Sequence, residues 1–249
     1  MRNARPIAAA SADIACGGVV LLHGIAVGAW TLKRMERALR ARGFATLNLD
    51  YASRKKPLDA LADDIHPAVS DFARRLDGPL HFVGHSMGGL LARVYVAKYR
   101  PDRLGRVVML GTPNGGSEIV DLLQAFPIYR WYFGPAGMQL ATRPDCPLAA
   151  LPALDYPVGI IAGNLSIYPI SSFILPRPND GRVSVASSKL AGMADHVTVR
   201  TVHSALPYHP AAIGQTIAFL SDGNFGLRAP TRFRSEVPGH DLAARGSQS

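Results

Sequence analysis

LHFVGHSMGG, residues 80–89, joins a strand pattern to a helix pattern and decides how the rest of the chain is arranged. Leu80, Phe82 and Val83 are typical of a short buried strand, and apolar residues after Ser86 recur at the three-and-four spacing of a helix face. Ser86 therefore lies at the corner, within the pattern G-x-S-x-G. So sharp a turn strains its central residue and requires small neighbours such as Gly84. The pattern predicts a serine hydroxyl at the carboxyl edge of a sheet and at a helix N-terminus, where backbone N–H groups favour negative charge.

Strand and helix patterns alternate on both sides of this corner. Amphipathic helix patterns separate apolar runs that we interpret as strands, at residues 19–22, 46–49, 80–83, 106–110, 156–162 and 197–202. This alternation predicts an α/β domain with a doubly wound, mostly parallel sheet of about six strands and helices on both faces. Ligands bind beyond the carboxyl ends of the strands in such sheets. His23-Gly24 and Ser86 both follow predicted strands, so we expect them at one edge.

Four segments are predicted. Residues 1–18 form an N-terminal arm, residues 19–223 the α/β domain, and residues 224–249 a flexible basic tail. Regular patterns are lost between about 117 and 155, a length typical of a cap or lid inserted over a site. Its aromatic side chains either line an apolar pocket or pack the cap onto the domain. Four apolar residues of this region and the loop beyond it are candidates for substrate binding: Trp131, Tyr132, Phe133 and Ile167.

Composition bounds the class of protein. With 249 residues, 48% of them hydrophobic and 18% charged, the chain can bury a sizeable core. No apolar run is long enough to span a bilayer and the N-terminus lacks a sustained apolar stretch, so a cytoplasmic location is expected. Cys16 and Cys146 match no metal or redox spacing, and no cluster of residues implies a metal or an organic cofactor.

The net charge of +9 raises the question of an anionic partner. The basic residues are spread over one helix near residues 33–42 and over the tail, without the aromatic interleaving of a single-strand nucleic-acid binder. A solvated surface is favoured over a specific nucleic-acid site. Peripheral contact with an anionic membrane surface or an acidic polymer stays open. The oligomeric state is not indicated.

A serine hydroxyl becomes a strong nucleophile when a histidine accepts its proton and a carboxylate orients that histidine. The usual order on a strand-turn-helix elbow is serine, acid, histidine. His203 directly follows the last predicted strand, at the edge expected for Ser86, and is the favoured base. The alternatives are His196 at the start of that strand, His209 before Pro210 as a capping residue, and His240 in the tail.

Asp180, in the Gly-containing loop NDGRV, lies between the penultimate strand and His203 and is the favoured acid. Asp155 and Asp195 precede strands, so both are expected at the opposite edge. A tetrahedral intermediate also needs two preorganised N–H donors, each contributing about 3 kcal/mol. The residue after the serine, Met87, offers one, and Ile25 beside His23-Gly24 offers the other.

Together these residues resemble the α/β-hydrolase fold, and within it the small bacterial triacylglycerol lipases and carboxylesterases. The resemblance extends from Val19 to Leu220 and rests on VVLLHGIAVGAW (19–30), GHSMGG (84–89), LGTPNGGS (110–117) and NDGRVSVASS (179–188), followed by His203. It implies that Ser86, Asp180 and His203 form the triad and that Ile25 and Met87 form the oxyanion hole. The short segment before Val19 implies a version without the extra N-terminal strands of larger members.

The leading interpretation is a serine ester hydrolase that cleaves apolar acyl esters, of small molecules or lipids, through an acyl-enzyme. A thioesterase or an acyltransferase would use the same residues. A hydrolase-fold binding protein without turnover is the alternative from a different class, and an electrostatic membrane or polymer binder is a third.

Overall fold

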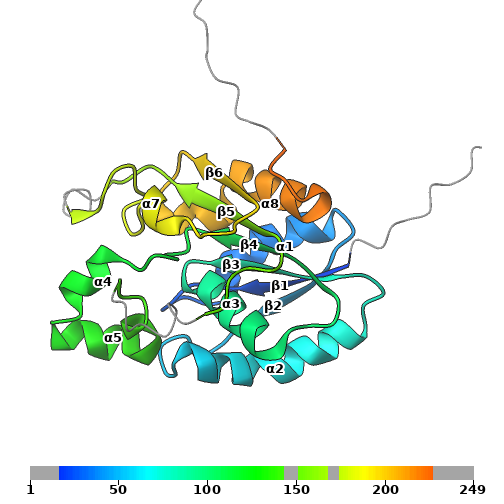
Figure 1. Cartoon of the computed structure of the whole chain (residues 1–249), viewed down its shortest axis with the longest axis horizontal. Coiled ribbons are helices and arrows are strands. Elements are labelled where there is room, and N and C mark those ends of the chain that lie inside the picture. The colour runs from blue at the N-terminus through cyan, green and yellow to red at the C-terminus, as the bar shows by residue number, and fades with distance from the viewer. Residues whose placement is uncertain (1–16, 143–150, 168–173, 227–249) are drawn as a thin grey trace, which may run out of the picture.

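The structure is a computed structural model and describes residues 17–142, 151–167 and 174–226. The expected arm and tail lie almost wholly outside the described residues. Within them, six strands form one sheet in the order β2-β1-β3-β4-β5-β6, and all neighbouring strands are parallel (Figure 1). The strands are β1 Gly18–Leu22, β2 Ala45–Leu49, β3 Leu80–His85, β4 Leu104–Leu110, β5 Val158–Gly163 and β6 Asp195–Val199. The expected sheet is therefore confirmed.

Helices cover both faces of the sheet. In the described ranges, the α-helices are α1 Lys33–Arg40, α2 Leu58–Arg74, α3 Met87–Tyr99, α4 Glu118–Leu123, α5 Pro127–Met138, α7 Val185–Ser188 and α8 Pro210–Asp222, and the 3-10 helices are η1 Ala29–Leu32 and η3 His203–Tyr208. Figure 1 shows α2 and α3 against one face, with α1 and α8 behind the sheet. None of the described helices is both long enough and apolar enough to cross a membrane.

The core has two layers because side chains alternate along each buried strand. Val20 and Leu22 of β1 join the layer that contains α2 and α3, whereas Val19 and Leu21 join the layer that contains α1 and α8. All five residues of β1 are buried, which accounts for its continuous apolar run. The carboxyl ends of β1 and β3 meet at Leu22 and Gly84, so the loops after these strands are neighbours.

The segment expected to be irregular contains two helices, α4 and α5, which Figure 1 shows beyond one end of the sheet. The sequence pattern obscured α5 because Gly134, with φ 61° and ψ −164°, and Pro135 interrupt it in the middle. Arg54 donates to the Tyr132 carbonyl oxygen at 3.2 Å, and Gln139 accepts from the Leu58 N–H at 2.8 Å. The helix is therefore fixed to the chain that leads into α2.

The sequence pattern predicts the last strand at residues 197–202, and these bounds are wrong, because the observed strand starts two residues earlier and ends three residues earlier. The observed β6 begins at Asp195 and ends at Val199, since the Thr201 N–H turns back to the Val199 carbonyl oxygen at 2.8 Å. His203 therefore does not directly follow the strand. It opens η3 after a short turn, still beyond the carboxyl end of β6.

Candidate active site

Ser86 is at the corner between β3 and α3, as its motif predicts. Its φ of 55° and ψ of −124° are strained for a residue with a side chain. The turn is held because the Ser86 N–H donates to the Leu110 carbonyl oxygen at 2.8 Å, and the Ser86 carbonyl oxygen accepts from the Gly89 N–H at 3.0 Å. Ser86 stays half-buried among buried neighbours. Its hydroxyl thus stands at the N-terminus of α3, where the helix dipole favours negative charge.

The turn requires glycine at positions 84 and 88, because other backbone segments pack too closely there to leave room for a side chain. A methyl group on Gly88 would lie 2.1 Å from the Leu22 carbonyl oxygen, and one on Gly84 would lie 2.4 Å from the Gly89 nitrogen. Helix α3 therefore begins directly against the end of β1. This contact also brings the loop after β1 to the serine, since a methyl group on Gly24 would stand 3.3 Å from the Ser86 Cβ.

Asp180 and His203 form a buried pair, with Asp180 Oδ2 2.8 Å from His203 Nδ1. The other carboxylate oxygen, Oδ1, accepts from the Arg182 N–H at 3.0 Å and from the Val183 N–H at 2.8 Å. A backbone hydrogen bond joins the same two residues, because the His203 N–H donates to the Asp180 carbonyl oxygen at 3.0 Å. An ionised carboxylate only accepts, so Nδ1 carries the proton and Nε2 is left with the lone pair that a general base needs.

The pair lies over the end of the strand next to the elbow. A methyl group on Gly111, which directly follows β4, would stand 3.2 Å from both Asp180 Oδ2 and His203 Nδ1. The residue before it, Leu110, accepts the hydrogen bond from the Ser86 N–H. Ser86, Asp180 and His203 are therefore gathered at the carboxyl edge of β3, β4 and β5.

His85, the residue before Ser86, contacts the backbone of His203. Its Nε2 lies 3.1 Å from the His203 carbonyl oxygen, an acceptor, so Nε2 carries a proton. The two imidazole rings lie 5.0 Å apart. Burial, followed by the proximity of His203, holds the pKa of His85 well below its usual range, so the ring stays neutral. His85 Nδ1 is buried without a hydrogen-bond partner.

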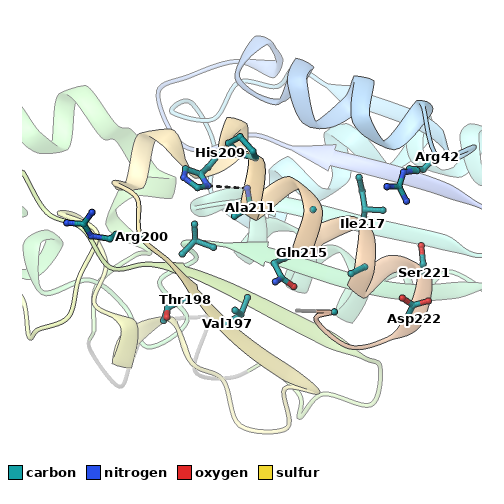
Figure 2. A pocket seen from close by; sticks show the side chains of 15 residues that line it. Arg42, Val197, Thr198, Arg200, His209, Ala211, Gln215, Ile217, Ser221 and Asp222 are labelled. Atoms are coloured by element: carbon teal, nitrogen blue, oxygen red, sulfur yellow. Dashed lines mark hydrogen bonds between the residues drawn. The ribbon is translucent and has the colours of Figure 1, made fainter. Parts of the chain in front are cut away.

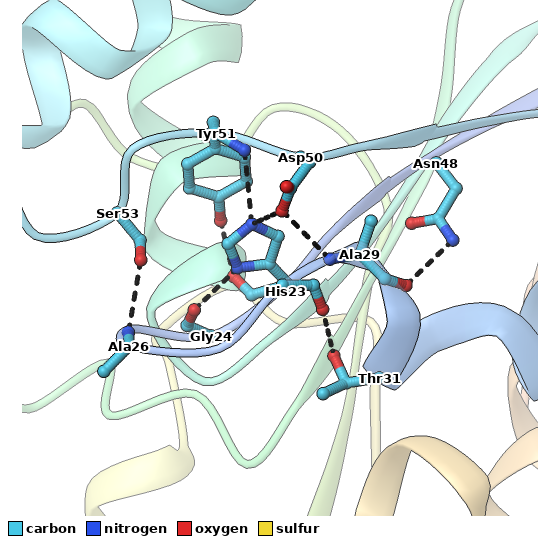
Figure 3. A network of polar contacts seen from close by, with 10 residues as sticks. His23, Gly24, Ala26, Ala29, Thr31, Asn48, Asp50, Tyr51 and Ser53 are labelled. Carbon is cyan, nitrogen blue, oxygen red and sulfur yellow. Dashed lines mark hydrogen bonds and ion pairs between the residues drawn. The ribbon is translucent and has the colours of Figure 1, made fainter.

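The loop after β1 carries the proposed oxyanion donor, and Figure 3 shows a polar network around it. His23 is fully buried, and its Nδ1 lies 2.7 Å from the Gly24 carbonyl oxygen. Burial is the main cause that lowers the pKa of His23, and the Gly24 carbonyl oxygen and the charge of Asp50 act in the opposite direction. Ile25 follows, half-buried, and a methyl group on Gly137 of α5 would lie 3.2 Å from its Cδ1. Met87, the other predicted donor, is buried at the first position of α3.

The structure places most of the alternative bases and acids on other elements or in other contacts. His209 caps α8 by accepting from the Ala211 N–H at 3.3 Å, and it lines a groove of about 980 Å³ between β6 and α8 (Figure 2). His196 lies within β6. Asp155 pairs with Arg100 before β5 begins, and Asp195 opens β6, where it accepts from the Phe225 N–H at 2.8 Å. His240 lies outside the described residues.

Three of the four candidates for substrate binding have exposed side chains. Trp131 is 78% exposed, and Ile167 and Tyr132 are also exposed. The guanidinium of Arg54 lies 5.1 Å from the centre of the Tyr132 ring. Phe133 is half-buried and meets Tyr132 edge to face, with ring centres 4.9 Å apart. A role for these side chains in acyl binding stays a prediction.

Sequence reasoning missed two sets of residues at the site. One is His85, which was treated only as part of the elbow motif. The other is Asp50 to Ser53, the loop after β2, which contacts the loop after β1. The signal was present, because residues that follow a strand of a parallel sheet reach its carboxyl edge.

The fold and the site define a class: an α/β protein with a strained serine at a strand-helix corner and an Asp-His pair at the same sheet edge. A model of the alpha/beta hydrolase fold family matches residues 19–153, more than half of the chain. The chain belongs to this family. It is 31% identical over 116 residues to a probable esterase, PIR7A, of Oryza sativa subsp. indica, a match that covers 43% of this chain and 44% of that protein. The chain therefore spans less than half the length of this curated relative.

Solved structures with this fold include several hydrolases. The mature lipase BlEst2 of Bacillus licheniformis has a TM-score of 0.65 at 18% identity, covering 87% of this chain and 95% of that one. The metagenomic carboxyl esterase MGS0156 has a TM-score of 0.63 at 19% identity, with 81% and 68% covered. The RedJ thioesterase of Streptomyces coelicolor has a TM-score of 0.55 at 15% identity, with 87% and 91% covered. At such identities these likenesses concern the fold.

Proposed function

We propose that this chain is a serine hydrolase of carboxylic esters, of the lipase or carboxylesterase type, with Ser86 as nucleophile, His203 as base and Asp180 as orienting acid. The observation that carries the proposal is the Asp180–His203 pair over the end of β4, whose backbone also holds Ser86. The paired carboxylate leaves His203 Nε2 as proton acceptor, which a serine at this corner needs.

In the proposed reaction, the Ser86 oxygen attacks the ester carbonyl carbon while its proton passes to His203 Nε2. The carbonyl oxygen becomes an oxyanion that accepts from the Met87 and Ile25 N–H groups. The carbon–oxygen bond then breaks, and the proton on Nε2 passes to the leaving alcohol, which gives an acyl-enzyme. Water repeats the steps, with His203 again as base, and releases the carboxylic acid and Ser86.

Asp180 stabilises the imidazolium that forms twice in this cycle. Its Oδ1 is fixed by two backbone N–H groups, so Oδ2 stays aimed at Nδ1. The positive end of the α3 dipole adds to the stabilisation of the oxyanion. The apolar residues on α5 and beside Ile25 favour an apolar acyl group over a charged one.

The experiment is hydrolysis of a p-nitrophenyl ester series from acetate to palmitate by the wild type and by Ser86→Ala. The control is Ser204→Ala, which removes an exposed serine beside His203. We expect Ser86→Ala alone to abolish turnover while the fold is kept, and the chain-length optimum to separate an esterase from a lipase. Full activity in Ser86→Ala would overturn the assignment.

Three alternatives give other results, each with its own substrate or reagent. Turnover of acyl thioesters without turnover of oxygen esters would assign a thioesterase, and transfer of the acyl group to an added alcohol would assign an acyltransferase. A hydrolase-fold binding protein would react slowly with an organophosphonate, because Ser86 would lack an activating base. Rapid covalent labelling of Ser86 in the wild type, lost in His203→Ala, would contradict that alternative.

A further inference from the structure

The proposed donor Ile25 lies in the loop after β1, where three consecutive peptide units each make a hydrogen bond to a side chain. Figure 3 shows these side chains. The Ile25 N–H belongs to the same rigid peptide unit as the Gly24 carbonyl group. In a trans peptide these two groups point in opposite directions. His23 Nδ1 donates to the Gly24 carbonyl oxygen at 2.7 Å, so this contact also sets the direction of the Ile25 N–H.

The peptide units before and after this one are held by side chains of the loop after β2. The carbonyl oxygen of His23, in the preceding unit, accepts from the Tyr51 hydroxyl at 2.5 Å. The N–H of Ala26, in the following unit, donates to Ser53 Oγ at 3.1 Å. Ala26 has a φ of 59°, an unfavourable conformation for a residue with a side chain, and therefore needs an external contact. Both contacts come from the loop that follows β2.

Tyr51 makes three contacts with His23. Besides the hydroxyl bond, its ring stacks on the imidazole with centres 4.1 Å apart and planes at 12°, and its N–H donates to His23 Nε2 at 3.3 Å. A backbone N–H can only donate, so Nε2 is an acceptor and the proton is on Nδ1, where Gly24 requires it. Burial is the main cause of a raised pKa of the Tyr51 hydroxyl, which keeps it a donor.

Asp50 adds a charged group at the edge of this network. Its Oδ1 accepts from the Ala29 N–H at 3.2 Å and also lies 3.2 Å from His23 Nε2. The Asp50 side chain is largely exposed to solvent, so water screens this contact. The contacts that fix the loop without such screening are those of Tyr51 and Ser53.

We propose that Tyr51, assisted by Ser53, is a positioning residue that fixes the peptide unit carrying the Ile25 N–H against Ser86. The catalytic meaning of this inference rests on the proposed function, because it takes Ile25 as an oxyanion donor. Donors stabilise a transition state when they are held in place before the charge develops. Loosening the loop should therefore slow the chemical step and leave substrate binding nearly unchanged.

The experiment compares Tyr51→Phe and Ser53→Ala with the wild type and with Tyr99→Phe. The Tyr99 control loses a hydroxyl bonded to Asp63 on the surface between α2 and α3. Two quantities are measured: ester hydrolysis as kcat and KM, and amide hydrogen exchange of the peptide covering residues 23–29. We expect kcat to fall about tenfold in Tyr51→Phe with KM within about twofold, and exchange of the loop to become faster. Ser53→Ala should show the same pattern, and Tyr99→Phe should match the wild type.

The two readouts separate this inference from the proposed function. Unchanged exchange of residues 23–29 in Tyr51→Phe and Ser53→Ala would overturn the positioning role, whatever the activity. Faster exchange with unchanged kcat would overturn its catalytic meaning. An inactive wild type whose Ser86 resists an organophosphonate would refute the proposed function, and the exchange data would still decide whether Tyr51 fixes the loop.

Discussion

Asp180 shows how a single carboxylate can dictate the protonation of a neighbour. In Asp180→Asn the amide oxygen is expected to keep the bonds from the Arg182 and Val183 N–H groups, because only oxygen can accept them. The NH2 group then faces His203 Nδ1 and forces the proton onto Nε2. We predict that kcat falls by about 10³–10⁴ while the protein stays folded.

The measurement is kcat for a short p-nitrophenyl ester together with the far-ultraviolet circular dichroism spectrum. Asp195→Asn is the matched control, since that carboxylate lies at the start of β6 and contacts the Phe225 N–H. Activity near the wild-type level in Asp180→Asn would move the orienting role to another acid.

Gly88 and Gly214 allow two effects of glycine to be compared: close backbone packing at Gly88 and a loss of helix propensity at Gly214. A methyl group on Gly88 would press on the Leu22 carbonyl oxygen at 2.1 Å, whereas one on Gly214 in α8 meets nothing within 4 Å. We predict that Gly88→Ala lowers the free energy of unfolding by about 3 kcal/mol or more. Gly214→Ala should raise it by about 1 kcal/mol, because alanine favours the helix. Urea denaturation of both variants checks the pair, and equal effects would contradict the contact at Gly88.

These residues also show what local sequence could and could not predict. Ser86 and its glycines were predictable because the elbow is a local turn with a strict steric requirement. The pairing of Asp180 with His203 was predictable from chain order and sheet edge, and their catalytic roles stay a prediction. The place of Tyr51 at this edge was predictable, because it follows a strand of the sheet. Its contacts with His23 were not, because they depend on the pairing of two parallel strands, and no pattern in residues 45–53 specifies that register.

At the scale of elements, the elbow strand carries a histidine that resists protonation. In the folded protein the pKa of His85 lies well below its usual value because the ring is buried between β3 and η3. The unfolded chain binds a proton near pH 6.5 and the folded chain does not, so the free energy of unfolding decreases as pH falls below about 6.5. His23 contributes with the same sign.

We predict that His85→Gln reduces this pH dependence by up to about 1.4 kcal/mol per pH unit between about pH 6.5 and 5. A glutamine amide can still donate to the His203 carbonyl oxygen, so the variant is expected to fold. Urea denaturation of both proteins at several pH values gives the slopes. Parallel curves for wild type and variant would show that His85 does not titrate differently in the two states.

Elements were predicted well where one physical signal dominated. All residues of β1 and β3 are buried, because helices cover both faces of the sheet there. Helix α5 was missed because its kink at Gly134 breaks the apolar spacing, and its position depends on contacts with Arg54 and Leu58. Such tertiary contacts are absent from any local pattern.

At the scale of the whole molecule, large apolar side chains are exposed on the loops and helices that follow the strands. Ile128 is 70% exposed, and Leu122, Phe126 and Trp30 are also exposed. Figure 1 shows α4 and α5 beyond the sheet, and basic residues Arg54, Lys55 and Lys56 precede α2 nearby. Apolar side chains beside cations suit the interface of an anionic bilayer.

We predict that the protein binds vesicles of phosphatidylcholine with about one-third phosphatidylglycerol more tightly than vesicles of phosphatidylcholine alone, because the chain carries a net charge of +9. Raising the salt concentration should weaken the first interaction through screening. A Leu122→Ser/Ile128→Ser double variant should weaken both, since it removes apolar area without changing charge. Co-sedimentation with the vesicles measures each effect. Binding that responds to salt alone, with the double variant unchanged, would show that charge attracts the protein to the surface and that α4 and α5 do not enter it.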